Sequence, residues 1–295
     1  MIIFNTIAVF IMKINDFGVL YIVATPIGNL QDMTFRAVEI LQSVDVIAAE
    51  DTRHSMPLLQ HYAIKTPVIS LHEHNERERA AQMLERLTKG ESIALISDAG
   101  TPLISDPGYF FVREARNKGI HVVPIPGSCA AIAALSAAGL PTDKFIFEGF
   151  LSSKSKQRKD SLKALLNESR TMIFYESPHR ILDLLHDMQD VLGGERILVI
   201  ARELTKKFET IREGTTHELI EWVKSDENQQ RGEIVVLLQG LKQAAAPEEG
   251  LEEVKKILPI LLESLPLKQA VDITTKITGY RKNEVYELAL KLKHD

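Results

Sequence analysis

Cysteine is almost absent from this chain of 295 residues, in which Cys129 is the only example. One thiol excludes an intrachain disulfide and agrees with the reducing cytosol. No histidine is spaced from a cysteine or from a second histidine as a zinc ligand would be, so no metal is expected. No apolar run reaches the roughly 20 residues that cross a bilayer, so no membrane association is expected either.

Surplus positive charge is missing too. The chain has 35 lysines and arginines against 40 acids, and its net charge of −5 argues against a protein that coats nucleic acid. A local basic patch is compatible with this net charge.

Two sequence motifs are also absent. The turn Pro26–Asn29 is not the G-x-G-x-x-G of dinucleotide binding, and Gly127–Ala130 is not the G-x-S-x-G elbow of a hydrolase.

The first seventeen residues are apolar as far as Met12 but do not make a signal peptide. They lack a basic region ahead of the apolar run, Asn5 interrupts that run, and no small-residue cleavage site follows. We interpret residues 1–17 as an N-terminal extension.

Short apolar runs alternate with amphipathic stretches from Val19 to Gly240. Ile93–Ile96 is apolar at consecutive positions, as in strands buried on both faces, whereas Ile181, Leu185, Met188 and Leu192 follow a helical period. This alternation predicts an α/β fold with largely parallel sheets. The small-residue stretch after PIPG predicts a hinge, and so two α/β domains over 18–125 and 126–240.

The composition changes after Gly240. The polar segment KQAAAPEEG predicts a linker over 241–250. Residues 251–295 then show only helical periodicity, with a Gly279-Tyr280 turn between two of the helices, which predicts a small helix-turn-helix-like domain. Pro259 is expected to kink or restart the first of these helices.

The segment Ser97–Gly108 is the most informative loop. It holds twelve small, polar and turn-forming residues directly after a predicted strand, whereas such loops usually have roughly 2–6 residues. Pro102 and Pro107 stiffen it, and Gly100 and Gly108 permit unusual backbone dihedrals. Because ligands of open α/β sheets bind at the carboxyl ends of the strands, this loop predicts a small-ligand site.

Ionisable residues follow three other predicted strands, in EDTRH, ESPHR and ARE. Each set has a structural alternative, such as a helix cap at Asp51 or a surface pair at Arg202–Glu203. Three sets at strand ends favour a site. The side chains that we select as catalytic candidates are Asp51, Glu176, His179 and Arg202.

The chain resembles the tetrapyrrole-methylase superfamily. The matching stretches run in order from Leu20 to Gly240: LYIVATPIGNLQDMTFRA, AEDTRHS, LISDAGTPLISDPG, PIPGSCAAIAALSAAGLP, FEGFL, FYESPHR and RGEIVVLL. The resemblance implies two α/β domains with S-adenosylmethionine bound in the cleft between them, and a homodimer. We also expect a cytoplasmic protein, in agreement with the single cysteine. The C-terminal helices are similar to a helix-turn-helix appendage found in the same superfamily.

The resemblance implies that the residues of this chain at the cofactor-binding positions of the superfamily bind the cofactor here. They are Pro26, Gly28, Ala99, Gly100, Thr101, Ile104, Ser105, Ser128, Glu176, Gly232, Glu233 and Ile234. Thr101 stands where the tetrapyrrole enzymes have aspartate in G-G-D-P. Contacts through that carboxylate are therefore not expected here, whereas backbone contacts are.

Within the superfamily, AEDTRHS, FYESPHR and the appended helices are similar to the branch that methylates RNA. This implies 2′-O-methylation of a cytidine ribose at the decoding centre of 16S ribosomal RNA, with the small ribosomal subunit as partner and no DNA partner. The basic patch between Lys154 and Lys163 is either a phosphate-binding surface or a solvated helix face. The residues that we predict to contact RNA are Asn29, Arg53, Lys154, Lys156, Arg158 and Lys159.

Two other functions remain open from the sequence. One is methylation of a small corrin or porphyrin precursor by the same fold. The other, of a different class, is a ribosome assembly factor without catalysis, against which the intact cofactor loops argue.

Overall fold

A computed structural model describes residues 17–72, 75–241 and 248–294. Residues 1–16 of the proposed N-terminal extension and most of the proposed linker lie outside these ranges. By internal contacts the chain divides into an α/β unit, residues 1–166 and 170–239, and a second unit of residues 167–169 and 240–295.

The first sheet of the α/β unit has the order β3-β2-β4-β1-β5, and all its paired strands are parallel. Its strands are β1 (Val19–Val23), β2 (Val46–Ala49), β3 (Val68–Ser70), β4 (Ile93–Ile96) and β5 (His121–Ile125). The surrounding helices are η1 (Leu30–Asp32), α1 (Phe35–Ser43), α2 (Thr52–His61), α3 (Glu76–Thr88) and α4 (Tyr109–Asn117).

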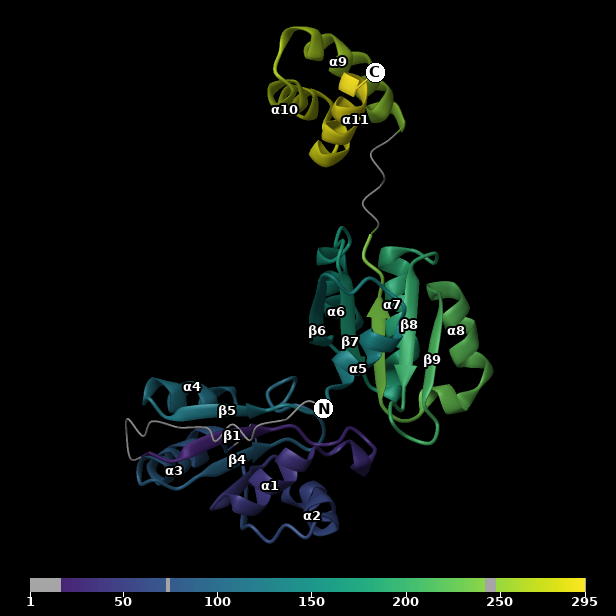
Figure 1. The fold of residues 1–295 in the computed structure, drawn as a ribbon. Coiled ribbons are helices and arrows are strands. Elements are labelled where there is room, and N and C mark those ends of the chain that lie inside the picture. Colours follow the sequence, from purple (N-terminus) through teal and green to yellow (C-terminus); the bar gives the residue numbers. More distant parts are fainter. Residues whose placement is uncertain (1–16, 73–74, 242–247, 295) are drawn as a thin grey trace, which may run out of the picture. The chain divides into compact units, whose positions relative to one another are not determined.

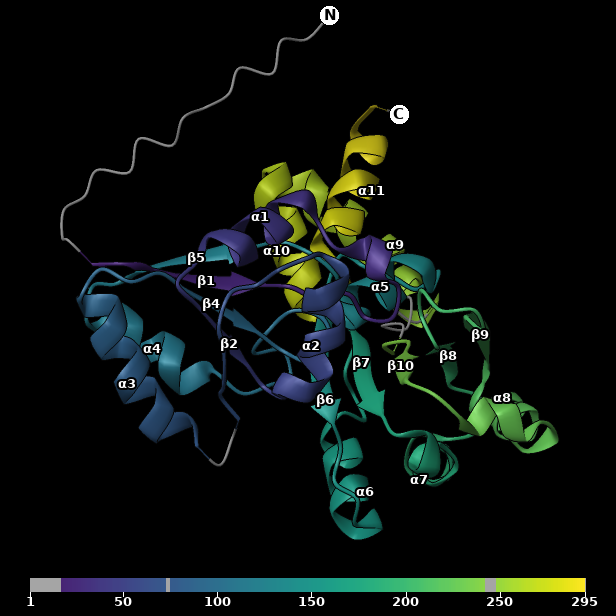
Figure 2. The ribbon, with the colours of Figure 1, turned by 90° about the horizontal axis from the view of Figure 1, so that it is seen from below.

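Helices cover both faces of this sheet (Figures 1 and 2). Leu41 of α1 and Leu59 of α2 pack in the core cluster on one face, and Met83 of α3 and Phe111 of α4 pack in the cluster on the other. Burial on both faces explains why Ile93–Ile96 is apolar at every position.

The second sheet has the order β6-β7-β10-β8-β9. Its strands are β6 (Phe145–Phe150), β7 (Thr171–Glu176), β8 (Ile197–Arg202), β9 (Thr210–Thr215) and β10 (Ile234–Leu238). Its helices are α5 (Ala130–Ala137), α6 (Ser155–Ala164), η2 (Pro178–Arg180), α7 (Ile181–Leu192), α8 (Thr216–Ser225) and η3 (Glu227–Gln230). The helices α6, α7 and α8 contribute to the core on one face of this sheet, and α5 contributes to the core on the other.

The expectation of largely parallel sheets was wrong for the second sheet. Only β6 and β7 pair in parallel, whereas β10 is antiparallel to both β7 and β8, and β9 is antiparallel to β8. The periodicity of a buried strand does not encode its direction. The edge strand β9 was not predicted, because its sequence TIREGT is polar and half-exposed and so resembles a loop.

The second unit contains α9 (Glu248–Ser264), α10 (Leu267–Thr278) and α11 (Lys282–His294). Their apolar stripes form one core that includes Val254, Leu258, Val271 and Val285. The predicted turn is present, with Gly279 in the left-handed conformation at φ +66°. A restart at Pro259 does not occur, because α9 is helical from Glu248 to Ser264.

Candidate functional site

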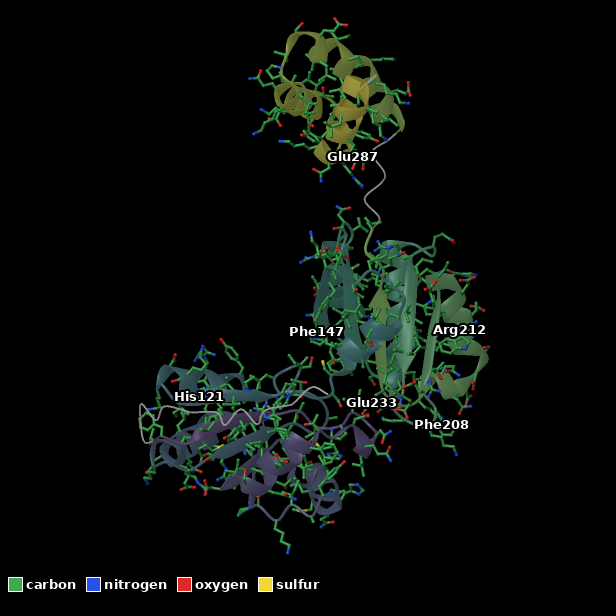
Figure 3. All side chains as sticks on the ribbon, in the orientation of Figure 1. His121, Phe147, Phe208, Arg212, Glu233 and Glu287 are labelled. Carbon is green, nitrogen blue, oxygen red and sulfur yellow. The ribbon has the colours of Figure 1, made fainter. Side chains whose placement is uncertain are left out.

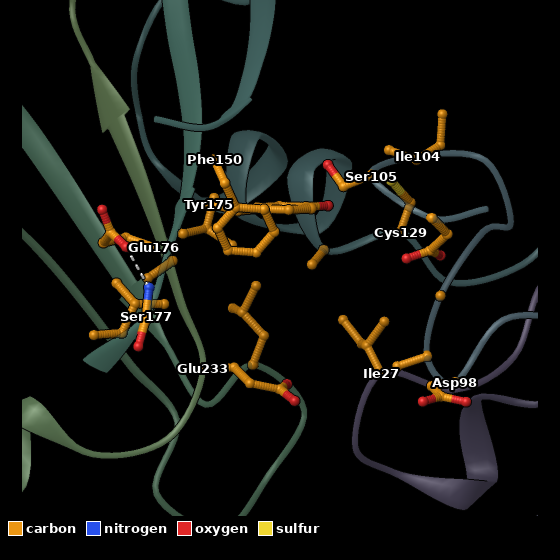
Figure 4. Close-up of a pocket in the computed structure, with 18 of the residues that line it drawn as sticks. Ile27, Asp98, Ile104, Ser105, Cys129, Phe150, Tyr175, Glu176, Ser177 and Glu233 are labelled. Atoms are coloured by element: carbon orange, nitrogen blue, oxygen red, sulfur yellow. Dashed lines mark hydrogen bonds between the residues drawn. The ribbon is translucent and has the colours of Figure 1, made fainter. Parts of the chain in front are cut away.

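A cavity of about 390 Å³ lies where loops at the carboxyl edge of the first sheet meet the second sheet (Figure 4). The first sheet supplies the loop after β4, and the second supplies residues of β6, β7, β8 and β10. Both sheets belong to the same α/β unit.

The loop after β4 is held rigidly at the cavity wall. The Gly100 amide donates to the Thr25 carbonyl at 3.0 Å, and the Thr25 amide donates back at 2.8 Å. The Thr101 hydroxyl donates to the Ser128 carbonyl at 2.9 Å. Leu103 and Ser105 have φ values of +72° and +70°, which side chains other than glycine rarely adopt. Such strain is typical of a backbone that presents itself to a ligand.

Most of the predicted cofactor residues line this cavity. They are Ala99, Gly100, Thr101, Ile104, Ser105, Glu176, Gly232, Glu233 and Ile234. Pro26, Gly28 and Ser128 do not line it. Ser128 holds Thr101 through its carbonyl, and Gly28 leaves room for another loop. A Cβ on Gly28 would lie 2.6 Å from Cγ of Lys206.

A second strained loop, residues 203–206, follows β8. Glu203 and Thr205 have φ values of +52° and +65°. Lys206 Nζ binds Oε1 of Glu203 at 2.9 Å and Oε2 of Glu233 at 3.1 Å. The Glu203 carboxylate also accepts from the Glu233 amide and leaves no space for a side chain at Gly232. This network fixes Glu233 at the end of the second sheet nearest the first (Figure 3).

Part of the apolar wall was missed from the sequence. Tyr175 and Phe150 line the cavity with ring centroids 5.6 Å apart, and Ile27, Leu204 and Val235 add aliphatic surface. The Tyr175 hydroxyl accepts from the Ala131 amide at 3.1 Å, and burial raises the pKa of Tyr175 to about 12. The apolar residues of β6 and β7 could have indicated buried strands, but not that one face of them borders a ligand cavity.

The cavity lining contains five carboxylates, of Glu50, Asp98, Asp106, Glu176 and Glu233, and no lysine or arginine. Burial, with Asp106 and Asp98 nearby, raises the pKa of Glu50. Burial also raises the pKa of Asp106, and the nearby Asp98 adds to this. Such a lining favours a ligand that carries positive charge.

Glu176 occupies a distinctive position in this lining. One carboxylate oxygen, Oε1, accepts from the Ser177 amide at 2.7 Å and pairs with Arg180 at 2.6 Å. The other, Oε2, is buried without a hydrogen-bond partner among the described residues. A buried oxygen without a donor is costly, so a ligand that supplies one would be stabilised here.

The other catalytic candidates do not line the cavity, although each follows a residue that does. Asp51 caps α2 and binds the Arg53 guanidinium, which holds the pKa of Asp51 well below its usual range. His179 is exposed and does not line the cavity. Arg202 is buried and donates to the carbonyls of Arg231 and Phe208, so it holds loops together.

The predicted RNA contacts are not all available. Lys154, Lys156 and Arg53 are exposed, Asn29 caps η1, and Lys159 pairs with Asp190 at 2.7 Å. The prediction that Arg158 contacts RNA was wrong. Its side chain is only 3% exposed, and its Nε lies 2.6 Å from Oδ2 of Asp187. An RNA phosphate cannot reach a guanidinium that is buried and paired in this way.

Asp106 allows a test of the electrostatics of the cavity. Because its pKa in the folded chain lies above the unfolded value, the ionised carboxylate destabilises the fold at neutral pH, and this penalty disappears as the pH falls below the unfolded pKa. Asp106→Asn should therefore raise the melting temperature at pH 7 but not at pH 3. The exposed Asp143 supplies the control variant Asp143→Asn. A gain of equal size at both pH values would contradict this reading of the cavity.

No group of three or more metal-ligating side chains occurs in the part of the chain that the structure describes. Among the same residues, no helix is long and apolar enough to span a membrane.

Comparison with known proteins identifies two families along the chain. Residues 19–220 match the Tetrapyrrole (Corrin/Porphyrin) Methylases, and residues 248–293 match the RsmI C-terminal HTH domain. The first match covers the whole first sheet and four strands of the second, ending before β10, and the second match covers the three terminal helices. The predicted fold, including the helix-turn-helix appendage, is confirmed.

Individual relatives are similar along almost their whole length. Ribosomal RNA small subunit methyltransferase I of Pseudomonas aeruginosa is 57% identical over 93% of this chain and 97% of its own length. The protein of the same name from Haemophilus influenzae is 55% identical over 92% of this chain and 96% of its own length.

Solved structures share the fold at low sequence identity. Cobalt precorrin-4 methyltransferase aligns with a TM-score of 0.56 at 18% identity, over 75% of this chain and 94% of its own. Uroporphyrin-III C-methyl transferase from Thermus thermophilus, solved with S-adenyl homocysteine, aligns with a TM-score of 0.53 at 15% identity, over 75% of this chain and 97% of its own.

The family matches and the close relatives confirm the expectation of an S-adenosylmethionine-dependent methyltransferase. The chain belongs to the tetrapyrrole (corrin/porphyrin) methylase family, in the group represented by ribosomal RNA small subunit methyltransferase I.

Proposed function

We propose that this methyltransferase transfers a methyl group from S-adenosylmethionine to the 2′-hydroxyl of a cytidine in 16S ribosomal RNA, at the decoding centre. The observation that carries the proposal is the 57% identity to a ribosomal RNA small subunit methyltransferase over 97% of that relative's length. The match includes the helical appendage, which belongs to the same family as that of RsmI proteins.

The cavity fits the proposed methyl donor. S-adenosylmethionine carries a sulfonium and an ammonium against one carboxylate. A lining with five acids, of which Arg180 and Lys206 pair only Glu176 and Glu233, complements its net charge. The unpartnered Oε2 of Glu176 offers an acceptor for an amino group. The cavity volume of about 390 Å³ is in the usual range for a small-molecule site.

When bound, the donor supplies a methyl group that is already activated by the sulfonium. The protein therefore has to orient it rather than activate it. Ala99, Gly100, Thr101, Ile104 and Ser105 would hold it from the first sheet, through a loop fixed by the Thr25 and Ser128 contacts. Gly232, Glu233 and Ile234 would hold it from the second sheet, with Glu176 beside them.

The RNA surface proposed here leaves out Arg158 and keeps the other predicted residues, of which Arg53, Lys154 and Lys156 are exposed cations. Arg53 and Asn29 lie on the first domain, and Lys154, Lys156 and Lys159 lie on or beside α6. Lysines bind phosphate as point charges, so they would position the RNA without selecting its sequence.

The salt dependence of binding tests this surface. Replacing Lys154 and Lys156 by glutamine should weaken binding to small subunits and reduce the slope of log affinity against log salt by about 2. Affinity for S-adenosylmethionine should not change. Lys224→Gln on α8 provides a control on another helix of the same domain. An unchanged salt slope in the double variant would reject a role of α6 in RNA binding.

Product analysis tests the reaction itself. Small subunits from a strain without this enzyme are incubated with the protein and methyl-labelled S-adenosylmethionine, and the RNA is digested to nucleosides. The proposal predicts labelled 2′-O-methylcytidine from 16S RNA. Label on a base, or on added corrin or porphyrin precursors but not on RNA, would support the small-molecule alternative. A protein that binds subunits but not the donor would support the assembly-factor alternative.

We also propose, from the family resemblance, that the enzyme works in the cytoplasm as a homodimer, with domain boundaries at 18–125, 126–240 and 251–295. Sedimentation equilibrium should then give about twice the chain mass of 33.1 kDa.

A further inference from the structure

A second cavity lies beside the first. Its volume is about 470 Å³, and Arg53, Ser70, His72 and Asp98 contribute to its lining. It shares Glu50 and Asp98 with the cavity proposed for the methyl donor. These two side chains therefore border both spaces.

Strand order explains this arrangement. β2 lies between β3 and β4, with Ala49 paired to Ser70 on one side and to Ile96 on the other. Glu50 follows Ala49 directly, so it leaves the sheet between Ser70 and the loop that carries Asp98. Parallel strands bring their carboxyl ends to one edge, which places the two cavities next to each other.

The lining of the second cavity suits a nucleotide. Carboxylates and the hydroxyls of Thr52 and Ser70 can bind ribose hydroxyl groups. The Arg53 guanidinium has 89% of its side chain exposed and can reach a phosphate from its position beside the cavity. The first cavity, in contrast, has no cation in its lining.

The three acids that line the second cavity, Glu50, Asp51 and Asp98, differ in the partners that hold their carboxylates. Asp51 binds Arg53 through two contacts at 3.1 and 2.7 Å, and Asp98 lies 3.3 Å from Nδ1 of His54. Glu50 takes part in none of the ion pairs that the described residues form, although the Asp98 amide donates to its carboxylate. The Arg53 guanidinium thus holds Asp51, and the Asp51 amide donates to Oδ1 of Asp98 at 3.0 Å, whereas Glu50 has no cationic partner among the described residues.

We propose that the second cavity receives the ribose of the acceptor nucleotide and that Glu50, between the two cavities, accepts the proton of the hydroxyl that is methylated. This inference rests on the proposed function and identifies the site on this chain where it takes place. It also replaces Asp51 as the candidate base.

The step balances without a further reactant. The hydroxyl oxygen forms a bond to the methyl carbon as the carbon–sulfur bond breaks, and the sulfur keeps the electron pair as a neutral thioether. The hydroxyl proton passes to the Glu50 carboxylate and then to solvent. A ribose hydroxyl is a weak nucleophile, so a base near the oxygen helps the reaction.

The electrostatic surroundings agree with this role. Burial raises the pKa of Glu50, and the carboxylates of Asp106, Asp98 and Asp51 act in the same direction, whereas the Asp98 amide opposes them. The imidazole of His54 on α2 also lies near Asp51 and Asp98. A carboxylate with a raised pKa is a stronger base than Asp51, whose pKa is lowered.

Glu50→Gln keeps the shape of the side chain and removes the base. The single-turnover rate of methyl transfer to small subunits should fall by about 10²-fold or more, which is the usual contribution of a general base. Affinity for S-adenosylmethionine, measured by calorimetry, should fall far less than the rate, because Glu50 is only one of the five acids that line the donor cavity. The wild-type rate should decrease as the pH falls through the pKa of Glu50, and the variant should lose this limb. Glu39→Gln, at an exposed position on α1, is the matched control.

Three results would contradict the inference. A Glu50→Gln rate equal to that of the wild type would exclude a base at this position. A loss of donor affinity as large as the loss of rate would assign Glu50 to the donor cavity alone. A pH profile of the variant equal to that of the wild type would point to another titrating group. If the wild-type protein left the ribose of 16S RNA unlabelled, the proposed function itself would fail, independently of Glu50.

Discussion

Replacing Arg158 by methionine should lower the free energy of unfolding of the α/β unit by about 3 kcal/mol. The Arg158 side chain is 3% exposed, and the Asp187 side chain is 8% exposed. Without the guanidinium, the Asp187 carboxylate stays buried with only the Ser155 hydroxyl at 2.9 Å and Lys159 Nζ at 3.4 Å. The loss lies at the lower end of the range for broken buried ion pairs because Lys159 remains.

Denaturant unfolding measures this loss, and a double variant separates its cause. Arg158→Met combined with Asp187→Leu removes both charges and should recover most of the stability, since apolar replacement of a whole buried pair is often neutral. Lys156→Met, on the exposed face of the same helix, should change stability little. If Arg158→Met unfolded like the wild type but weakened RNA binding, the original sequence prediction for Arg158 would be right.

Gly100→Val should reduce the affinity for S-adenosylmethionine by roughly ten- to a hundredfold, from about 1–3 kcal/mol of backbone strain. Gly100 has a φ of +83°, and a Cβ there would lie 3.3 Å from Cγ2 of Ile27. The loop can relieve this strain only by leaving its contacts with Thr25, and then it no longer presents Ala99 and Thr101 to the cavity.

Gly139→Ala supplies the control for that experiment. Gly139 also has a left-handed φ, +71°, but nothing lies within 4 Å of an added Cβ and it does not line the cavity. It should lower stability without affecting donor affinity, as calorimetry can show. Equal donor affinity in Gly100→Val and wild type would mean that the loop after β4 does not hold the donor.

The fold was predictable where burial controls the sequence. Ile93–Ile96 is buried at every position and was found as a strand, and the apolar stripe with Val254 and Leu258 revealed the terminal helices. Strand direction in the second sheet was not predictable, because β10 enters between β7 and β8 by long-range pairing. The exposed edge strand β9 carried no apolar period.

The site was predictable through its loops more than through its walls. Ser97–Gly108 stood out because its length and glycines exceed what a connection needs, and it lines the cavity. Phe150 and Tyr175 did not stand out, since an inward aromatic residue looks the same whether it faces a core or a cavity. Arg158 was misassigned because its partner Asp187 is 29 residues away, on another helix.

A crystal of the protein soaked with S-adenosylhomocysteine tests the central claim most directly. The ligand should occupy the space bounded by Gly100, Tyr175 and Ile234, with its sulfur toward the side of Glu50. Density for the ligand anywhere else on the α/β unit, with this space left to solvent, would contradict the account.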